Sequence, residues 1–233
     1  MIVRYVDDRV LLISQPDHAR LAGEVMSNAT ALKRHPRRER ILKAINSHDD
    51  GWAVEDAKPS LDPATGEIAD FMRARTEVRQ GVWPRCVGSL AEEDPWAAAL
   101  VAHHAITVYT RLRANPDWNS FFAKMSLIRD TLMKKAGLRA VELEADYVYL
   151  RLGDLISLAF CTGSSDLNQF SGYRVELFRE RVIVEPDLFG GQEIPMQITA
   201  VELATRRFAS DDELLDALET GFTTTIVGSV SHR

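Results

Sequence analysis

The chain has 233 residues, of which 45% are hydrophobic and 27% charged, a balance that excludes a wholly disordered protein. The formal net charge of -6 gives no global attraction to nucleic acid or to an anionic membrane surface. Cys86 and Cys161 cannot build a disulfide framework, and no stretch approaches the roughly 18 apolar residues of a membrane span. We therefore expect a soluble cytoplasmic protein that folds as a single domain over residues 1–233.

The first predicted elements are two short strands followed by helices. IVRYV and VLLIS are rich in β-branched and apolar residues, and Asp7-Asp8-Arg9 between them suits a hairpin turn. From Pro16 the apolar residues recur every three or four positions, which predicts a helix. A second helix is expected over residues 37–45.

Residues 50–93 are predicted to be mostly irregular, around at most one short helix, because prolines and glycines recur throughout them. A stretch of this length inside a domain is more often a functional loop than a spacer. Helical periodicity returns over about residues 95–114, 118–136 and 142–161, which predicts three further helices.

After Gly163 the hydrophobic period returns to two, which predicts the strands YRVELF, RVIVEP, QITAVELA and TTTIVGSV. Ser210 and Glu213 form a capping box at the start of one short helix among them. The predicted fold is therefore mainly α with an α+β layout. A helical bundle would occupy residues 15–163, and the flanking segments 1–14 and 172–230 would pair into a small β-sheet.

Polar side chains interrupt the apolar faces of four predicted helices: His18, His48 with Asp49, His104, and Asp154. Each has an ordinary explanation alone, since a buried histidine usually bonds a backbone carbonyl and Asp154 could pair with Arg151. Together they indicate a metal site, because the cores of helical proteins are where facing helices build such sites. Imidazole and carboxylate suit iron, manganese, zinc or cobalt rather than calcium.

The order of His18, the pair His48-Asp49, a histidine doublet and Asp154 resembles the HD-domain superfamily of metal-dependent hydrolases. The resemblance implies an HD-like helical bundle. It also implies a metal-ligand set, with the doublet supplying further candidates: His18, His48, Asp49, His103, His104 and Asp154. The segments QPDHARLAG, NSHDDGW, LVAHHAITVY and LGDLISLAFC are similar to an uncharacterised bacterial family known only as a domain of unknown function.

The sequence departs from the binuclear HD pattern in two places. No histidine lies between His48 and His103, where binuclear members have one, and AITVYTRL lacks the glycine-rich signature of some cyclic-dinucleotide phosphodiesterases. A single ion on His18, His48, Asp49 and Asp154 is therefore the safer expectation, although two ions stay open. His104 would then be a fifth ligand or face the substrate.

Residues near these ligands supply further candidates. We expect Asp49, Asp50 and His104 to act as catalytic groups that orient water or move a proton. The candidate substrate-binding residues are Gln15, Trp52, Arg73 and Arg75. A phosphate clamp formed by the arginines of this irregular segment, which include Arg79, is chemically reasonable, with a solvated loop face as the alternative.

The resemblance and the ligand set together lead to a functional expectation. We expect a metal-dependent phosphohydrolase that uses one or two divalent ions of iron, manganese or zinc to cleave a small-molecule or nucleotide phosphate ester. The expected partner is a small-molecule substrate, with no nucleic acid and no membrane, and a homodimer is left open. Two alternatives stay open: an HD-type di-iron oxygenase and a catalytically silent sensor that binds a metabolite.

Overall fold

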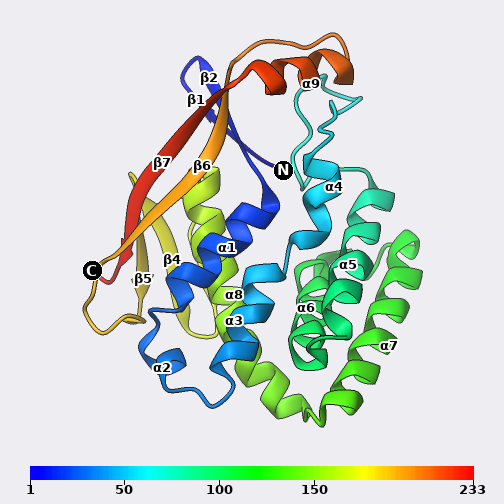
Figure 1. The fold of residues 1–233 in the computed structure, drawn as a ribbon, viewed down its shortest axis with the longest axis vertical. Coiled ribbons are helices and arrows are strands. Elements are labelled where there is room, and N and C mark those ends of the chain that lie inside the picture. The colour runs from blue at the N-terminus through cyan, green and yellow to red at the C-terminus, as the bar shows by residue number, and fades with distance from the viewer.

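The computed structural model describes residues 1–233 and shows helices packed against a curled sheet (Figure 1). The sheet has seven strands, which follow one another in this order: β1 (Ile2–Val6), β2 (Arg9–Ile13), β6 (Ile194–Ala204), β7 (Phe222–Ser231), β5 (Arg181–Glu185), β4 (Tyr173–Phe178) and β3 (Asn168–Phe170). All neighbouring strands are antiparallel except β5 and β7, which are parallel. The result is a mixed sheet curled into half a barrel.

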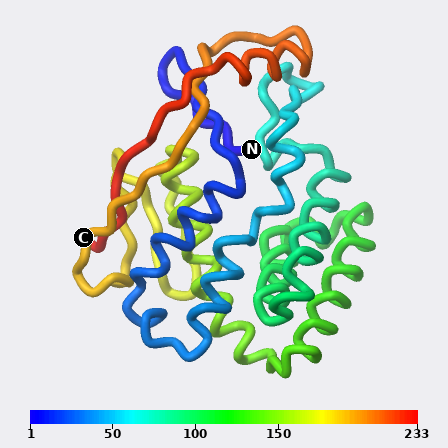
Figure 2. Tube along the Cα trace, in the orientation of Figure 1, coloured from blue at the N-terminus to red at the C-terminus, as the bar shows by residue number.

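The expectation of an HD-like helical bundle with a small terminal sheet is wrong. The two terminal segments do meet, because β2 pairs with β6, with Val10 opposite Leu203 and Leu12 opposite Val201. However, β6 and β7 are 11 and 10 residues long and pair over most of their length. The sheet is therefore a large one that covers one side of the molecule (Figure 2). The two-residue period predicts individual strands, but it does not specify their length or order, which depend on pairing between distant segments.

The helices and helical turns lie along the chain in the following order: α1 (Gln15–Met26), α2 (Thr30–Lys33), α3 (Arg38–Ser47), η1 (Asp50–Trp52), α4 (Ala53–Asp56), α5 (Thr76–Ala91), α6 (Pro95–Val108), η2 (Thr110–Leu112), η3 (Pro116–Trp118), α7 (Asn119–Ala136), α8 (Ala140–Thr162) and α9 (Asp211–Thr220). Local caps set several of the starts. Ser14 accepts a hydrogen bond from the backbone N–H of Asp17, and Asp94 caps α6 in the same way. Neither α6 nor any other helix combines the length and the apolar composition needed to cross a lipid bilayer.

Helix α5 corrects the expectation that residues 50–93 are mostly irregular. It runs for 16 residues through Gly81, Pro84 and Gly88. Trp83 and Val87 on this helix are buried against the rest of the protein, and this packing outweighs the low helix propensity of glycine and proline. The remaining irregular part consists of residues 57–75 and the short turn after α5.

Helix α8 lies between the sheet and the other helices (Figure 1). It contacts α1, α3 and α6 on one side and strands β1, β4 and β5 on the other. Gly153 permits this close packing, because a Cβ atom there would lie 2.8 Å from Met26 Cγ and 3.4 Å from Ile45 Cγ2. The largest core cluster gathers 55 buried residues around this helix and therefore connects the sheet with the site described next.

Candidate metal centre

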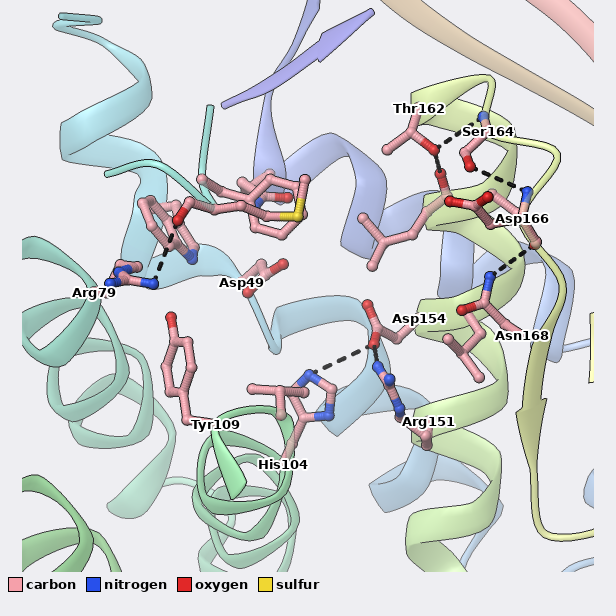
Figure 3. Close-up of a pocket in the computed structure, with 18 of the residues that line it drawn as sticks. Asp49, Arg79, His104, Tyr109, Arg151, Asp154, Thr162, Ser164, Asp166 and Asn168 are labelled. Carbon is pink, nitrogen blue, oxygen red and sulfur yellow. Dashed lines mark hydrogen bonds and ion pairs between the residues drawn. The ribbon is translucent and has the colours of Figure 1, made fainter. Parts of the chain in front are cut away.

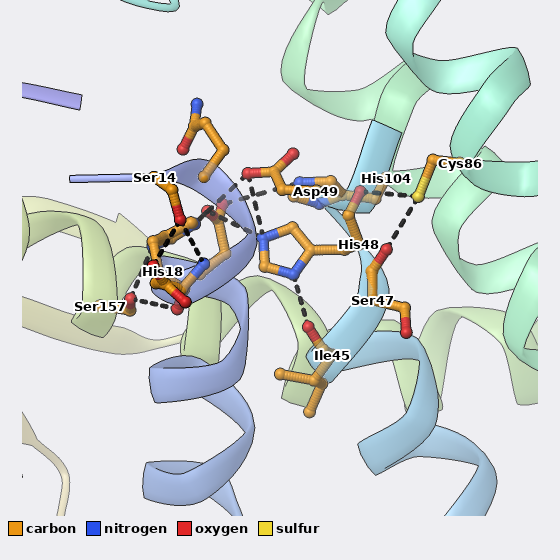
Figure 4. A network of polar contacts seen from close by, with 12 residues as sticks. Ser14, His18, Ile45, Ser47, His48, Asp49, Cys86, His104 and Ser157 are labelled. Carbon is orange, nitrogen blue, oxygen red and sulfur yellow. Dashed lines mark hydrogen bonds and ion pairs between the residues drawn. The ribbon is translucent and has the colours of Figure 1, made fainter. Parts of the chain in front are cut away.

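Five side chains from four parts of the chain converge in the buried interior (Figures 3 and 4). They come from α1, the end of α3, α6 and α8: His18, His48, Asp49, His104 and Asp154. The two aspartates are only 7% and 3% exposed, and the three histidines are buried as well. The predicted ligand positions of the sequence are therefore neighbours in space.

The distances between their side-chain atoms suit a shared ion. His18 Nε2 lies 3.5 Å from Asp49 Oδ2 and 3.4 Å from Asp154 Oδ1. His48 Nε2 lies 3.6 Å from each of these two oxygens, and His104 Nε2 lies 3.8 Å from Asp154 Oδ2. Ligand atoms that each bind a first-row metal at about 2.1 Å are separated by roughly 3.0–3.5 Å. The cluster is thus slightly wider than an occupied site and needs only a small contraction.

Hydrogen bonds outside the cluster fix the tautomers of two histidines. The Ser157 hydroxyl donates to the His18 carbonyl oxygen at 2.7 Å, so it accepts from His18 Nδ1 at 2.6 Å. His48 Nδ1 donates to the carbonyl oxygen of Ile45, also at 2.6 Å. In the neutral ring, with its proton on Nδ1, each Nε2 presents a lone pair to the cluster, as in histidines that bind metals.

Electrostatics keeps the carboxylates ionised. Burial alone would raise the pKa of Asp154, but the Arg151 guanidinium beside it holds this pKa well below its usual range. The Arg151 guanidinium forms an ion pair with Asp154 from one turn earlier in α8. Burial lowers the pKa of His104 to about 3, so its imidazole is neutral at pH 7. Of the two roles expected for His104, a neutral ring favours that of a ligand.

The residues present fit a metal ion. His18 Nε2 and His48 Nε2 are buried and have no hydrogen-bond partner, which is costly for a polar atom unless something else binds it. Nitrogen and carboxylate oxygen together are a donor set for iron, manganese or zinc. This buried group of histidines and aspartates could therefore hold a divalent transition metal.

Glycine lets the histidine–aspartate turn approach the neighbouring helix. A Cβ atom at Gly51 would lie 2.1 Å from the carbonyl oxygen of Val82 on α5. The segment NSHDDGW therefore packs directly on α5, where the Cys86 thiol donates to the carbonyl oxygens of Ser47 and His48. These contacts hold His48 and Asp49 in place at the end of α3.

A pocket of about 400 Å³ opens beside the cluster (Figure 3). Asp49, His104 and Asp154 form part of its lining, together with apolar residues of α8. Of the predicted substrate-binding residues, Gln15 and Trp52 line this pocket. The Gln15 side chain is buried, and its Oε1 has no hydrogen-bond partner.

Four other predicted site residues lie away from the cluster. His103 Nε2 is 3.4 Å from Glu144 Oε1, so this ring is directed away from Asp154. Asp50 faces a separate surface depression. Arg73 pairs with Glu67 at the surface, and Arg75 is exposed immediately before α5; neither lines the pocket.

One side of the pocket is formed by Arg79, Trp83 and Tyr109. Trp83 and Tyr109 were not predicted as site residues, and Arg79 was considered only as part of a phosphate clamp in an irregular segment. Arg79 and Trp83 lie four residues apart on α5, a spacing that would have placed them on one face if this helix had been predicted. Burial raises the pKa of Tyr109 to about 12, so its hydroxyl keeps its proton at neutral pH. These residues add hydrogen-bond donors to the pocket.

The fold and the site thus define an α+β protein with a buried histidine–aspartate cluster beside a pocket. The chain belongs to the family described as "Protein of unknown function (DUF3891)", whose model matches residues 1–209. This range includes every residue of the cluster and ends before α9 and β7. No curated protein and no solved structure matches the chain.

Proposed function

We propose that this protein is a metal-dependent hydrolase that cleaves a phosphate ester of a small molecule or nucleotide. One observation carries the proposal: the Nε2 atoms of His18 and His48 are buried, have no hydrogen-bond partner and lie close to a carboxylate oxygen of Asp154. The order of the ligands along the chain resembles the HD-domain superfamily, and this resemblance supports hydrolysis as the reaction.

The ion would be held by the whole cluster: His18, His48, Asp49, His104 and Asp154. A divalent iron, manganese or zinc ion would lower the pKa of a coordinated water and polarise a phosphoryl oxygen. The convergent atoms account for one ion. His103, which a second ion would require, lies against Glu144 instead.

Residues of the pocket would orient the substrate and move a proton. The Asp49 carboxylate belongs to the cluster and also lines the pocket, so it can accept a proton from the attacking water. The Arg151 guanidinium lines the same pocket and can donate to a phosphoryl oxygen while it keeps Asp154 ionised. Apolar side chains such as Leu155 and Leu158 would exclude water from the bound ester.

Metal analysis combined with an activity assay tests this function. The purified protein should contain about one iron, manganese or zinc ion per chain, and Asp154→Ala should lose that ion. Asp166→Ala is the matched control, because Asp166 lines the same pocket but lies outside the cluster, and it should retain the metal. Metal retained by Asp154→Ala would contradict the assigned site.

Phosphate release and oxygen uptake should be measured in parallel on a panel of phosphate esters, with iron-loaded and manganese-loaded protein. Release of phosphate without oxygen uptake is the expected result. Substrate-dependent oxygen uptake with two irons per chain would contradict the hydrolase and favour an oxygenase. A fully occupied site with neither activity would favour a metabolite sensor.

A further inference from the structure

The side of the pocket formed by α5 carries two hydrogen-bond donors without partners. Arg79 Nε and Trp83 Nε1 are both buried, and neither has a hydrogen-bond partner in the protein. Trp83 as a whole is 4% exposed and lines the pocket together with Arg79. Buried donors are normally satisfied, so an unsatisfied pair at a pocket wall indicates a ligand that accepts hydrogen bonds.

The positive charge of Arg79 is also uncompensated. Its Nη1 donates to the carbonyl oxygen of Met72 at 3.3 Å, and its guanidinium lies 5.3 Å from the centre of the Trp118 ring. These contacts hold the side chain in place without neutralising it. No ion pair includes Arg79, whereas Arg151 across the pocket is paired with Asp154 (Figure 3).

Aromatic contacts place these donors next to the cluster but outside it. The Trp83 ring lies 5.4 Å from the His104 ring and 6.1 Å from the Tyr109 ring, measured between centroids. Arg79 lies one turn before Trp83 on α5, and Figure 3 shows Arg79 and Tyr109 together on the side of the pocket away from Asp154. A group bound between them would therefore lie beside the cluster without replacing any of its residues.

We propose that Arg79, Trp83 and Tyr109 form an oxyanion-binding subsite that is separate from the histidine–aspartate cluster. Guanidinium and indole N–H groups only donate hydrogen bonds, so this wall selects an anionic acceptor such as phosphate or carboxylate over a cation. As a statement about the substrate, the inference rests on the proposed function. The substrate would then carry a second anionic group beside the ester that is cleaved.

Binding of inorganic phosphate to chelator-treated protein tests the subsite without any contribution from a metal. Isothermal titration of the wild type should show one phosphate per chain. Arg79→Gln should weaken binding at least about tenfold, and Trp83→Phe, which keeps a ring but removes the N–H, should weaken it by about three- to tenfold. Equal phosphate affinity in wild type and Arg79→Gln, or no binding by the wild type, would overturn the proposal.

Arg113→Gln is the matched control. Arg113 also lies over an aromatic ring, that of Phe122, but it does not line the pocket. This variant removes the same charge and should bind phosphate as the wild type does; an equal loss in both variants would mean that general charge, not the subsite, attracts phosphate. If Arg79→Gln does not fold, Trp83→Phe and Arg79→Lys take its place. Phosphate affinity equal to that of the wild type in both of these variants would then overturn the proposal.

A parallel titration with acetate identifies the anionic group. Tighter binding of phosphate, lost in Arg79→Gln, assigns a phosphate subsite, and the reverse preference assigns a carboxylate subsite. The outcome is independent of the proposed function, because phosphate binding by the metal-free protein requires neither a metal nor hydrolysis. A protein that binds phosphate at Arg79 but never binds metal would refute only the hydrolase.

Discussion

Asp146 provides a test of the packing that holds α8 in position. Its carboxylate is fully buried and accepts hydrogen bonds from Arg37 Nε at 2.7 Å, Arg37 Nη2 at 2.8 Å and Trp96 Nε1 at 2.9 Å. These bonds join α8 to the residue that precedes α3 and to the first turn of α6. Arg37 belongs to a basic run in the sequence, and its charge is used inside the protein.

Asp146→Ala would leave Trp96 Nε1 without an acceptor and Arg37 with only its longer contact to Glu142 Oε1, at 3.7 Å. Removal of one partner from a buried ion pair costs about 3–5 kcal/mol. The Arg37 side chain is 22% exposed, so water can replace part of the lost interaction, and we expect a loss near the lower value. At about 2–4 °C per kcal/mol for a chain of this size, about 3 kcal/mol corresponds to a fall in Tm of roughly 6–12 °C.

Thermal and urea unfolding of Asp146→Ala and Asp130→Ala measure this difference. Asp130 pairs with Arg129 at 2.8 Å but is 62% exposed, so its removal should cost at most about 1 kcal/mol. Metal content should be unchanged in Asp146→Ala, because Asp146 precedes Asp154 by about two helical turns. An Asp146→Ala protein as stable as Asp130→Ala would refute the reasoning.

Three further predictions concern the cluster. Metal added to chelator-treated protein should raise Tm, since a free concentration of 100 Kd stabilises by about 2.7 kcal/mol; the rise should disappear in Asp154→Ala, and a persistent rise would place the ion elsewhere. His104→Ala should abolish phosphate release and weaken metal binding, whereas His103→Ala should reduce release only modestly; the opposite order would exclude His104 as the ligand. Gly153→Ala should cost about 1–3 kcal/mol and lower metal occupancy, because its Cβ would meet Met26; unchanged stability and metal content would show that α8 can shift at no cost.

The cluster could be predicted from the sequence because its residues interrupt regular apolar patterns. His18 and Asp154 each fall on the buried side of a helix whose period is clear, and a buried polar residue is the exception that needs a cause. The same periodicity does not show which helices face one another across the interior. It did separate His104, on the inward face with Leu100 and Val108, from His103 toward the edge, since adjacent positions point about 100° apart. In the structure His103 lies against Glu144 instead of the cluster.

The arrangement of the sheet and the side of the pocket formed by α5 could not be predicted in this way. Strand pairing between β2 and β6 joins residues almost 200 positions apart, and no local pattern specifies such a partner. Arg79 was considered only as part of a phosphate clamp in an irregular segment, and its place on a helix was missed for a different reason. Gly81 and Pro84 suggested a loop, and the burial of Trp83 that makes this segment helical depends on neighbours distant in the sequence.

Two buried carboxylates of α8, Asp146 and Asp154, engage partners on different elements of the protein. A single inserted or deleted residue between them would rotate one relative to the other by about 100° and shift it by about 1.5 Å along the axis. One of the two would then face the wrong neighbours, whichever end of the helix kept its place. The segment between Asp146 and Asp154 must therefore remain seven residues long, even where its side chains are free to vary.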